Sequence, residues 1–281
     1  MRPVTGNEFH ERLDAYYAAG DAAGAYAFLR TQRDAARSAG DLGLLLTADN
    51  ALIGHCRENV IFDEVEGYYR EALDCIEQMG LHGSHAEATT FLNTATAFCI
   101  MGRAEESERL YDAAEALYQK LLPPDDPYMA AVRNNRGLLL RSQGQTAAAY
   151  ASFEKALAVL EKCADVEAET AATRLNLASV SPDTDTADAH LAAAAPYFAT
   201  PDGQRDIHRF TAMATRAELA FRRGDFRAAG DGFAATAAAW QEARGAEARR
   251  KVLLRNALAS YEKAGDADAA ADIRAMLEGT T

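Results

Sequence analysis

Apolar residues recur in this chain at the spacing of one face of an α-helix. Between Leu110 and Leu121, and again between Ala149 and Leu160, they stand three or four positions apart. Both segments therefore predict amphipathic helices that bury one stripe. The stripes comprise Leu110, Tyr111, Ala114, Leu117 and Leu121 in the first helix, and Ala149, Phe153, Ala156, Leu157 and Leu160 in the second. One helical hairpin cannot bury such a stripe alone, so neighbouring hairpins must stack.

The pattern repeats with a period of 42 residues. Asn93 aligns with Asn135 at this offset, and Gly102 aligns with Gly144. A fixed period of this length is typical of arrays in which each repeat is one helical hairpin. Strands have little support, because β-branched runs are scarce. We predict an all-α solenoid of about seven helix-turn-helix repeats, which form a single domain over residues 1–281.

Each repeat is placed by its central turn. The expected turns are at Gly20, Asn59–Val60, Gly102, Gly144, Pro182–Thr184, Gly224 and Gly265. Glycine suits a helix that ends in a left-handed residue, since it has no Cβ to clash with the backbone. At the second turn we expect Asn59 to take this conformation, because Val60 is β-branched.

The fifth repeat departs most from the pattern. Pro182 stands at its turn, Pro196 is expected to interrupt its second helix, and Pro201 follows. Proline removes a backbone donor and kinks or ends a helix. We therefore predict an irregular repeat near 181–203 that serves as the hinge of the array.

The charge is strongly negative but unevenly distributed. The net charge of −13 disfavours nucleic acid as a general partner, because phosphates would be repelled. From Gln204 to Asn256, however, eleven Lys or Arg stand against six Asp or Glu, a balance of +5. No apolar run approaches 18 residues and no leader segment is visible, so we expect a cytoplasmic protein without membrane contact.

The repeat resembles the tetratricopeptide repeat, in the longer 42-residue type of kinesin light chains and bacterial helical-repeat proteins. The resemblance rests on Asn134–Asn135, Gly137, Gly144, Ala149, Phe153, Ala156 and the preceding loop Pro123–Pro127. It implies a right-handed superhelix in which the first helix of each hairpin lines a concave groove. It also implies a scaffold that binds proteins or peptides.

Asparagine recurs at one phase of the predicted first helices. Asn93, Asn135, Asn176 and Asn256 are separated by one or two periods, and Asn50 falls within one residue of the same place. Asparagine is less favourable than alanine inside a helix, by roughly 0.5–0.7 kcal/mol. In the family this phase faces the groove, and one amide offers a peptide unit both a donor and an acceptor. The alternative is a structural ladder between neighbouring helices.

Basic residues extend the predicted site. Arg222, Arg255 and Lys263 fall at the groove-facing phase by the same register and would suit an acidic peptide. The alternative is a solvated surface on which these residues pair with Glu218, Asp225 and Glu247.

Catalytic and metal-binding chemistry find little support. His82 and His85 have H-x-x-H spacing, but they lie in an expected loop without a nearby carboxylate or Cys triad. Cys56, Cys75, Cys99 and Cys163 have no C-x-x-C spacing and read as buried free thiols. No phosphate-binding or nucleophile motif is present. We expect no catalytic residue, no metal and no cofactor.

The sequence therefore predicts a non-enzymatic scaffold that holds an extended segment of a protein or peptide partner in its groove. The peptide-binding residues are predicted to be Asn50, Asn93, Asn135, Asn176, Asn256, Arg222 and Arg255. Two alternatives remain: a scaffold that dimerises through its helical edges, and an enzyme with a site in the groove.

Overall fold

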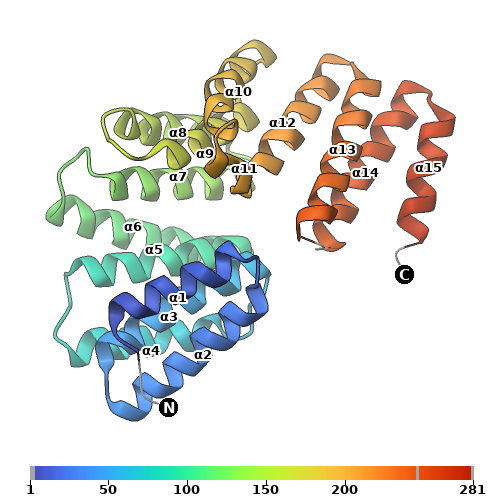
Figure 1. Cartoon of the computed structure of the whole chain (residues 1–281). Helices are drawn as coiled ribbons and strands as arrows, with labels where there is room; N and C mark the ends of the chain where they lie inside the picture. Colours follow the sequence, from blue (N-terminus) through green and yellow to red (C-terminus); the bar gives the residue numbers. More distant parts are fainter. Residues whose placement is uncertain (1–3, 245–246, 280–281) are drawn as a thin grey trace. The chain divides into compact units, whose positions relative to one another are not determined.

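The computed structural model describes residues 4–244 and 247–279 of the chain. These residues form helices and connections, with no strand among them. The chain divides into two compact units, Met1–Leu139 and Leu140–Thr281 (Figure 1). The all-α solenoid class is confirmed, whereas the single domain and the handedness of the superhelix stay predictions. None of the described helices is long and apolar enough to cross a membrane.

Fifteen helices follow one another in the part of the chain that the structure describes. The first six are α1 (Gly6–Ala18), α2 (Ala22–Ala39), α3 (Leu42–Asn59), α4 (Val65–Gln78), α5 (His85–Ile100) and α6 (Ala104–Leu121). Then come α7 (Pro127–Ser142), α8 (Thr146–Leu160), α9 (Glu167–Val180), α10 (Thr184–Phe198) and α11 (Pro201–Arg205). The last four are α12 (His208–Arg223), α13 (Phe226–Arg244), α14 (Glu247–Ala264) and α15 (Ala267–Glu278). Apart from the short α11, the helices follow one another in the order of the seven predicted hairpins, with a connection at each predicted turn.

Apart from the turn of the fifth hairpin, the turns within the hairpins share one hydrogen-bonding arrangement. At Gly102, with φ of 77°, the next residue's N–H reaches back to the Phe98 carbonyl at 2.9 Å. Val60 occupies the same position in the second hairpin with φ of 61°, and Ile61 N–H bonds the Cys56 carbonyl at 2.9 Å. The prediction for Asn59 is therefore wrong: its side-chain amide bonds the His55 carbonyl at 2.9 Å and keeps it helical. Val60 takes the strained conformation so that the orphan carbonyl is satisfied.

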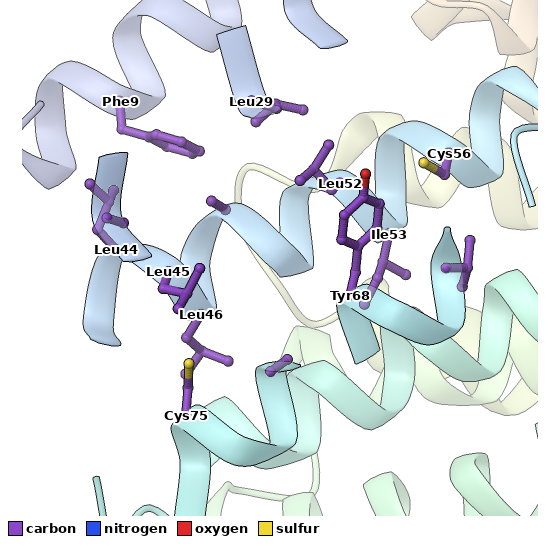
Figure 2. Close-up of a cluster of buried hydrophobic side chains, with 14 of the residues drawn as sticks. Phe9, Leu29, Leu44, Leu45, Leu46, Leu52, Ile53, Cys56, Tyr68 and Cys75 are labelled. Atoms are coloured by element: carbon purple, nitrogen blue, oxygen red, sulfur yellow. The ribbon is translucent and has the colours of Figure 1, made fainter. Parts of the chain in front are cut away.

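One apolar cluster of the first unit packs side chains of α1 to α5 together (Figure 2). Phe9, Leu29, Leu52 and Ile53 are fully buried there, on α1, α2 and α3. Side chains of α4 also belong to this cluster, among them Tyr68. Full burial of such a side chain contributes roughly 1.5–3 kcal/mol relative to exposure.

The predicted stripes are correct for α8 and partly correct for α6. All five apolar positions of α8 are buried. In α6, Tyr111 and Ala114 are fully buried, but Leu121 at the end of the helix is 44% exposed. Tyr118, which the prediction omitted, is fully buried and its hydroxyl lies 2.9 Å from Thr89 Oγ1.

The fifth repeat is irregular, but not in the predicted way. Helix α10 runs through Pro196 and ends two residues later at Phe198, so the proline does not interrupt the helix as predicted. The irregularity lies in the connection to α12, which contains the extra helix α11. That this repeat is also a hinge stays a prediction.

Candidate functional site

A cleft of about 500 Å³ lies in the second unit, along the first helices of the last three hairpins. It is lined from α9, α12 and α14, with Phe233 of α13 between them and Arg141 at the end of α7. This is the row of helices that the sequence assigned to the groove. We call it the first-helix cleft.

The floor of the first-helix cleft is apolar. Leu175, Leu253 and Phe233 are buried there. Val252, in contrast, is 51% exposed although it also lines the cleft. An exposed valine beside a buried floor offers apolar surface that an incoming side chain can cover.

The walls carry hydroxyls and opposite charges. Arg141 Nη1 donates to Ser179 Oγ at 2.9 Å, and Ser179 Oγ donates to the Asn176 carbonyl at 2.7 Å. The Arg249 guanidinium lies 5.7 Å from the centre of the Trp240 ring. Glu218, an exposed side chain, contributes a carboxylate to this lining. The cleft can therefore bind apolar side chains and hydrogen-bond a polar backbone.

Of the site residues predicted in the second unit, some line the first-helix cleft and others do not. Asn256 lines the first-helix cleft and is exposed. Arg222 does not face a ligand freely, because its Nη2 donates to the Ser181 carbonyl at the end of α9, at 3.1 Å. Arg255 is exposed but does not line the cleft. Lys263 lies over the Phe221 ring at 4.9 Å.

The ion pairs beside Arg222 differ from those that the alternative interpretation expected. Arg223, rather than Arg222, forms ion pairs with Asp188 and Asp185 of α10. The side chain of Glu247 lies outside the described residues.

In the first unit two asparagines of the predicted ladder are in direct contact. Asn93 Nδ2 on α5 donates to Asn50 Oδ1 on α3 at 3.1 Å. Asn50 Nδ2 donates in turn to Thr90 Oγ1 at 3.0 Å and to the Leu46 carbonyl at 3.1 Å. Asn50 thus uses its donors within the protein, as the structural alternative requires. The side-chain oxygen of Asn93 accepts no hydrogen bond from the described residues.

Asn135 on α7 and Asn176 on α9 occupy the same phase of their helices. Asn135 is half-buried, and its amide has no hydrogen bond within residues 4–244 and 247–279. Asn176 stands one residue after Leu175 of the first-helix cleft, and its carbonyl accepts the Ser179 hydroxyl. Asn135, Asn176 and Asn256 belong to helices that open the fourth, fifth and seventh hairpins.

Sequence reasoning missed the arginines that line the cleft. Arg249 was counted within the basic stretch but given no role, and Arg141 lies outside that stretch. Arg141 could have been found from its place at the polar end of a first helix, six residues after Asn135. The Trp240 ring that Arg249 covers is brought there by the fold.

The remaining candidates have local roles. His82 Nδ1 lies 3.0 Å from Glu87 Oε1, so the prediction of no nearby carboxylate was wrong. His85 packs edge-on against Tyr128, with ring centres 4.4 Å apart. Among the described residues no three His, Cys, Asp or Glu converge as metal ligands would. None of the four cysteines forms a disulfide; Cys56 and Cys75 are buried as expected, whereas Cys99 and Cys163 are only half-buried.

Comparison with known families identifies the central repeats. Residues 86–162 match the tetratricopeptide repeat. This is the stretch that carries the clearest 42-residue period. Tetratricopeptide repeats are helical scaffolds that generally mediate protein–protein interactions. No curated protein matches the chain.

Solved structures share the fold. BtubC (BKLC) from P. vanneervenii is 25% identical, with a TM-score of 0.57 over 70% of this chain and 81% of that one. A Podosopora anserina protein, described as a kinesin light chain with nearly identical TPR-like repeats, is 16% identical. Its TM-score is 0.54 over 72% of this chain and 97% of that one. The expected likeness to the kinesin-light-chain type of repeat is therefore confirmed.

Proposed function

We propose that this chain, a helical-repeat protein whose residues 86–162 match the tetratricopeptide repeat, is a non-enzymatic scaffold that holds an extended segment of another protein. The segment binds along the first helices, and the first-helix cleft of the second unit is its main anchor. The observation that carries this proposal is the cleft itself, which joins an apolar floor to hydroxyl and amide walls.

The chemistry of the walls supports an extended ligand. A peptide without regular structure leaves its N–H and C=O groups in need of partners. Asn256 and the hydroxyls of Thr211 and Thr215 stand on the cleft walls where they can supply such partners. Several net contributions of about 0.5–1.5 kcal/mol each, added to one buried apolar side chain, are consistent with micromolar binding.

The charges favour an acidic segment. Among the side chains that the structure describes, Arg141 and Arg249 line the cleft with one carboxylate, Glu218. Both arginines belong to the second unit, whose residues 204–256 carry a net charge of +5. Arginine binds carboxylates through several donors in a fixed plane, which gives both affinity and orientation. Arg222 and Arg255 would then attract the acidic segment electrostatically, without direct contact.

The asparagines divide between two roles in this proposal. Asn50 orients Asn93 through the amide–amide hydrogen bond of 3.1 Å. Asn93, Asn135, Asn176 and Asn256 then contact the backbone of the ligand. Their common phase on the first helices supports this assignment.

The proposal can be tested by blocking the cleft. Peptides are selected from a random twelve-residue display library on the full chain, then measured against the variants Ala259→Trp and Ala235→Trp. Ala259 is an exposed residue of the cleft lining, whereas Ala235 is exposed on α13 outside it. We expect Ala259→Trp to weaken the selected peptides at least tenfold and Ala235→Trp to leave them unchanged.

Two results would contradict the proposal. One is equal binding to both tryptophan variants, which would place the peptides elsewhere. The other is a family of selected peptides without acidic residues. Sedimentation of the unliganded chain, run alongside, tests the alternative of dimerisation through the helical edges.

A further inference from the structure

A second cavity, of about 810 Å³, lies in the second unit at the junction of the fifth and sixth hairpins. It is lined by α10, α12 and α13, with Gln204 of α11 at one end. The lining belongs to the second helices α10 and α13 and to a face of α12 that the first-helix cleft does not use. We call it the α10–α13 notch.

Hydrogen bonds fix helix α11 against the end of α10, beside this junction. Thr200 caps it, accepting the Gly203 N–H at 3.1 Å, and Tyr197 Oη donates to Asp206 Oδ2 at 2.9 Å. Gln204 Nε2 donates to the Phe198 carbonyl at 2.5 Å. A Cβ at Gly203 would clash with the Tyr197 carbonyl, so the approach of α11 to the end of α10 requires glycine there.

The walls of the notch are short side chains over an apolar floor. Ala195 of α10 and Ala199, which directly follows α10, line it on one side, and Ala239 and Ala243 line it from α13. Alanines cannot span the gap between the two helices, so the space stays unfilled. Leu191, Phe198 and Met213 form the floor, and methionine adapts well to different apolar partners.

Charged residues stand on the rim at helical spacing. Arg209 and Arg216 are seven residues apart on α12, which is two helical turns or about 10.5 Å. Arg216 is exposed and has no ion pair in the described part of the chain. Glu242 stands on α13, which supplies the other wall. The α12 side is therefore basic and the α13 side acidic.

We propose that the α10–α13 notch binds a short amphipathic helix of another protein. The apolar face of that helix would cover Met213 and the alanine walls, and two acidic residues seven positions apart would meet Arg209 and Arg216. An extended segment would leave its backbone N–H and C=O groups without partners against alanine walls, whereas a helix bonds them internally. This surface is independent of the first-helix cleft and would give the scaffold a second partner.

A defined probe tests this. We would use a fluorescent, side-chain-bridged 15-residue helical peptide with Leu at positions 4, 8 and 11 and Glu at positions 5 and 12. A second peptide carries Lys at positions 5 and 12. In fluorescence anisotropy with the full chain, we expect the Glu peptide to bind at least fivefold more tightly than the Lys peptide. Arg216→Glu should reverse that preference.

Matched tryptophan variants locate the binding. Ala195 lines the notch, and Ala193 is exposed on the same helix outside the lining. Ala195→Trp should weaken the Glu peptide at least tenfold, whereas Ala193→Trp and the first-helix variant Ala259→Trp should leave it unchanged. Equal affinity for both α10 variants, an unchanged preference in Arg216→Glu, or no binding at 1 mM chain would overturn the proposal.

Discussion

Asp49 on α3 is a fully buried carboxyl at the contact of three helices. Its Oδ1 accepts Arg33 Nε of α2 at 2.6 Å, and its Oδ2 has no hydrogen-bond partner. Glu71 of α4 shares Arg33 and also accepts two bonds from Arg37 at 2.8 Å. Burial raises the pKa of Asp49 to about 7, although the Arg33 hydrogen bond and charge lower it. A carboxyl in this position prefers to hold its proton.

This geometry predicts a pH-dependent effect of Asp49→Asn. The folded state holds the Asp49 proton more tightly than the unfolded state, whose pKa is about 3.9. The wild type therefore loses stability as the pH rises from about 4 to about 7. The melting temperature of the variant relative to wild type should rise over this window, by a few degrees, and stay constant above it.

Glu71→Gln supplies the opposite control. Burial raises the pKa of Glu71, but the hydrogen bond from Arg37 and the charges of Arg33 and Arg37 together outweigh burial, so the net pKa is lowered. Glu71 thus stabilises the fold above its unfolded pKa and loses that effect as the pH falls. The relative melting temperature of this variant should fall as the pH rises from 3 to 5. Parallel pH curves for both variants would refute the assigned directions.

The asparagine ladder makes a second prediction at this scale. Asn93→Ala removes the bond to Asn50 and should lower the free energy of unfolding by about 0.5–1 kcal/mol. Asn135→Ala, whose amide has no such bond, should be neutral or stabilise by a few tenths of a kcal/mol. Thermal unfolding of the two variants measures this difference. Equal destabilisation would mean that the Asn135 amide also holds the structure.

Single residues show where sequence reasoning reaches its limit. The 42-residue period identified the phase of the asparagines, because a helix fixes which positions share a face. It could not show that the Asn50 amide donates to Thr90, since that hydrogen bond joins two hairpins. Nor could it show that Arg222 reaches the Ser181 carbonyl 41 residues away.

At the scale of elements, the turn at Val60 makes the clearest prediction. Val60 is 67% exposed and has a left-handed backbone, which costs a residue with a Cβ about 1–2 kcal/mol. Val60→Gly should therefore raise the melting temperature by roughly 2–4 °C. Val60→Ala keeps a Cβ and should give a smaller change. A lower melting temperature for the glycine variant would show that the valine side chain stabilises the turn.

The helices themselves were largely predictable. Helix ends lie at all seven predicted turns. Glycine marks five of these turns, and the 42-residue period placed the other two, at Val60 and at Pro182–Thr184. Helix α11 was not predicted, since five residues are too few for a period to be read. Tyr118 was omitted because its aromatic partners come from other elements, His85 and Tyr128 among them.

For the molecule as a whole, the distribution of charge predicts how binding depends on salt. Arg249→Ala should weaken an acidic ligand of the first-helix cleft about fivefold at low ionic strength. The loss should shrink at 0.5 M salt, because screening already removes part of the attraction. Titrations of the wild type and the variant at both salt concentrations measure this. A loss that is independent of salt would mean that Arg249 acts through packing on Trp240.

The central claim is that a partner lies against the first helices of the second unit. Photocrosslinking tests it most directly, with p-benzoylphenylalanine at Val252 in the cleft and at Ala235 outside it. In the cells that produce the protein, Val252 should yield a discrete crosslinked partner that Ala259→Trp abolishes, and Ala235 should yield none. Crosslinks from Ala235 alone, or from both positions regardless of Ala259→Trp, would contradict the account.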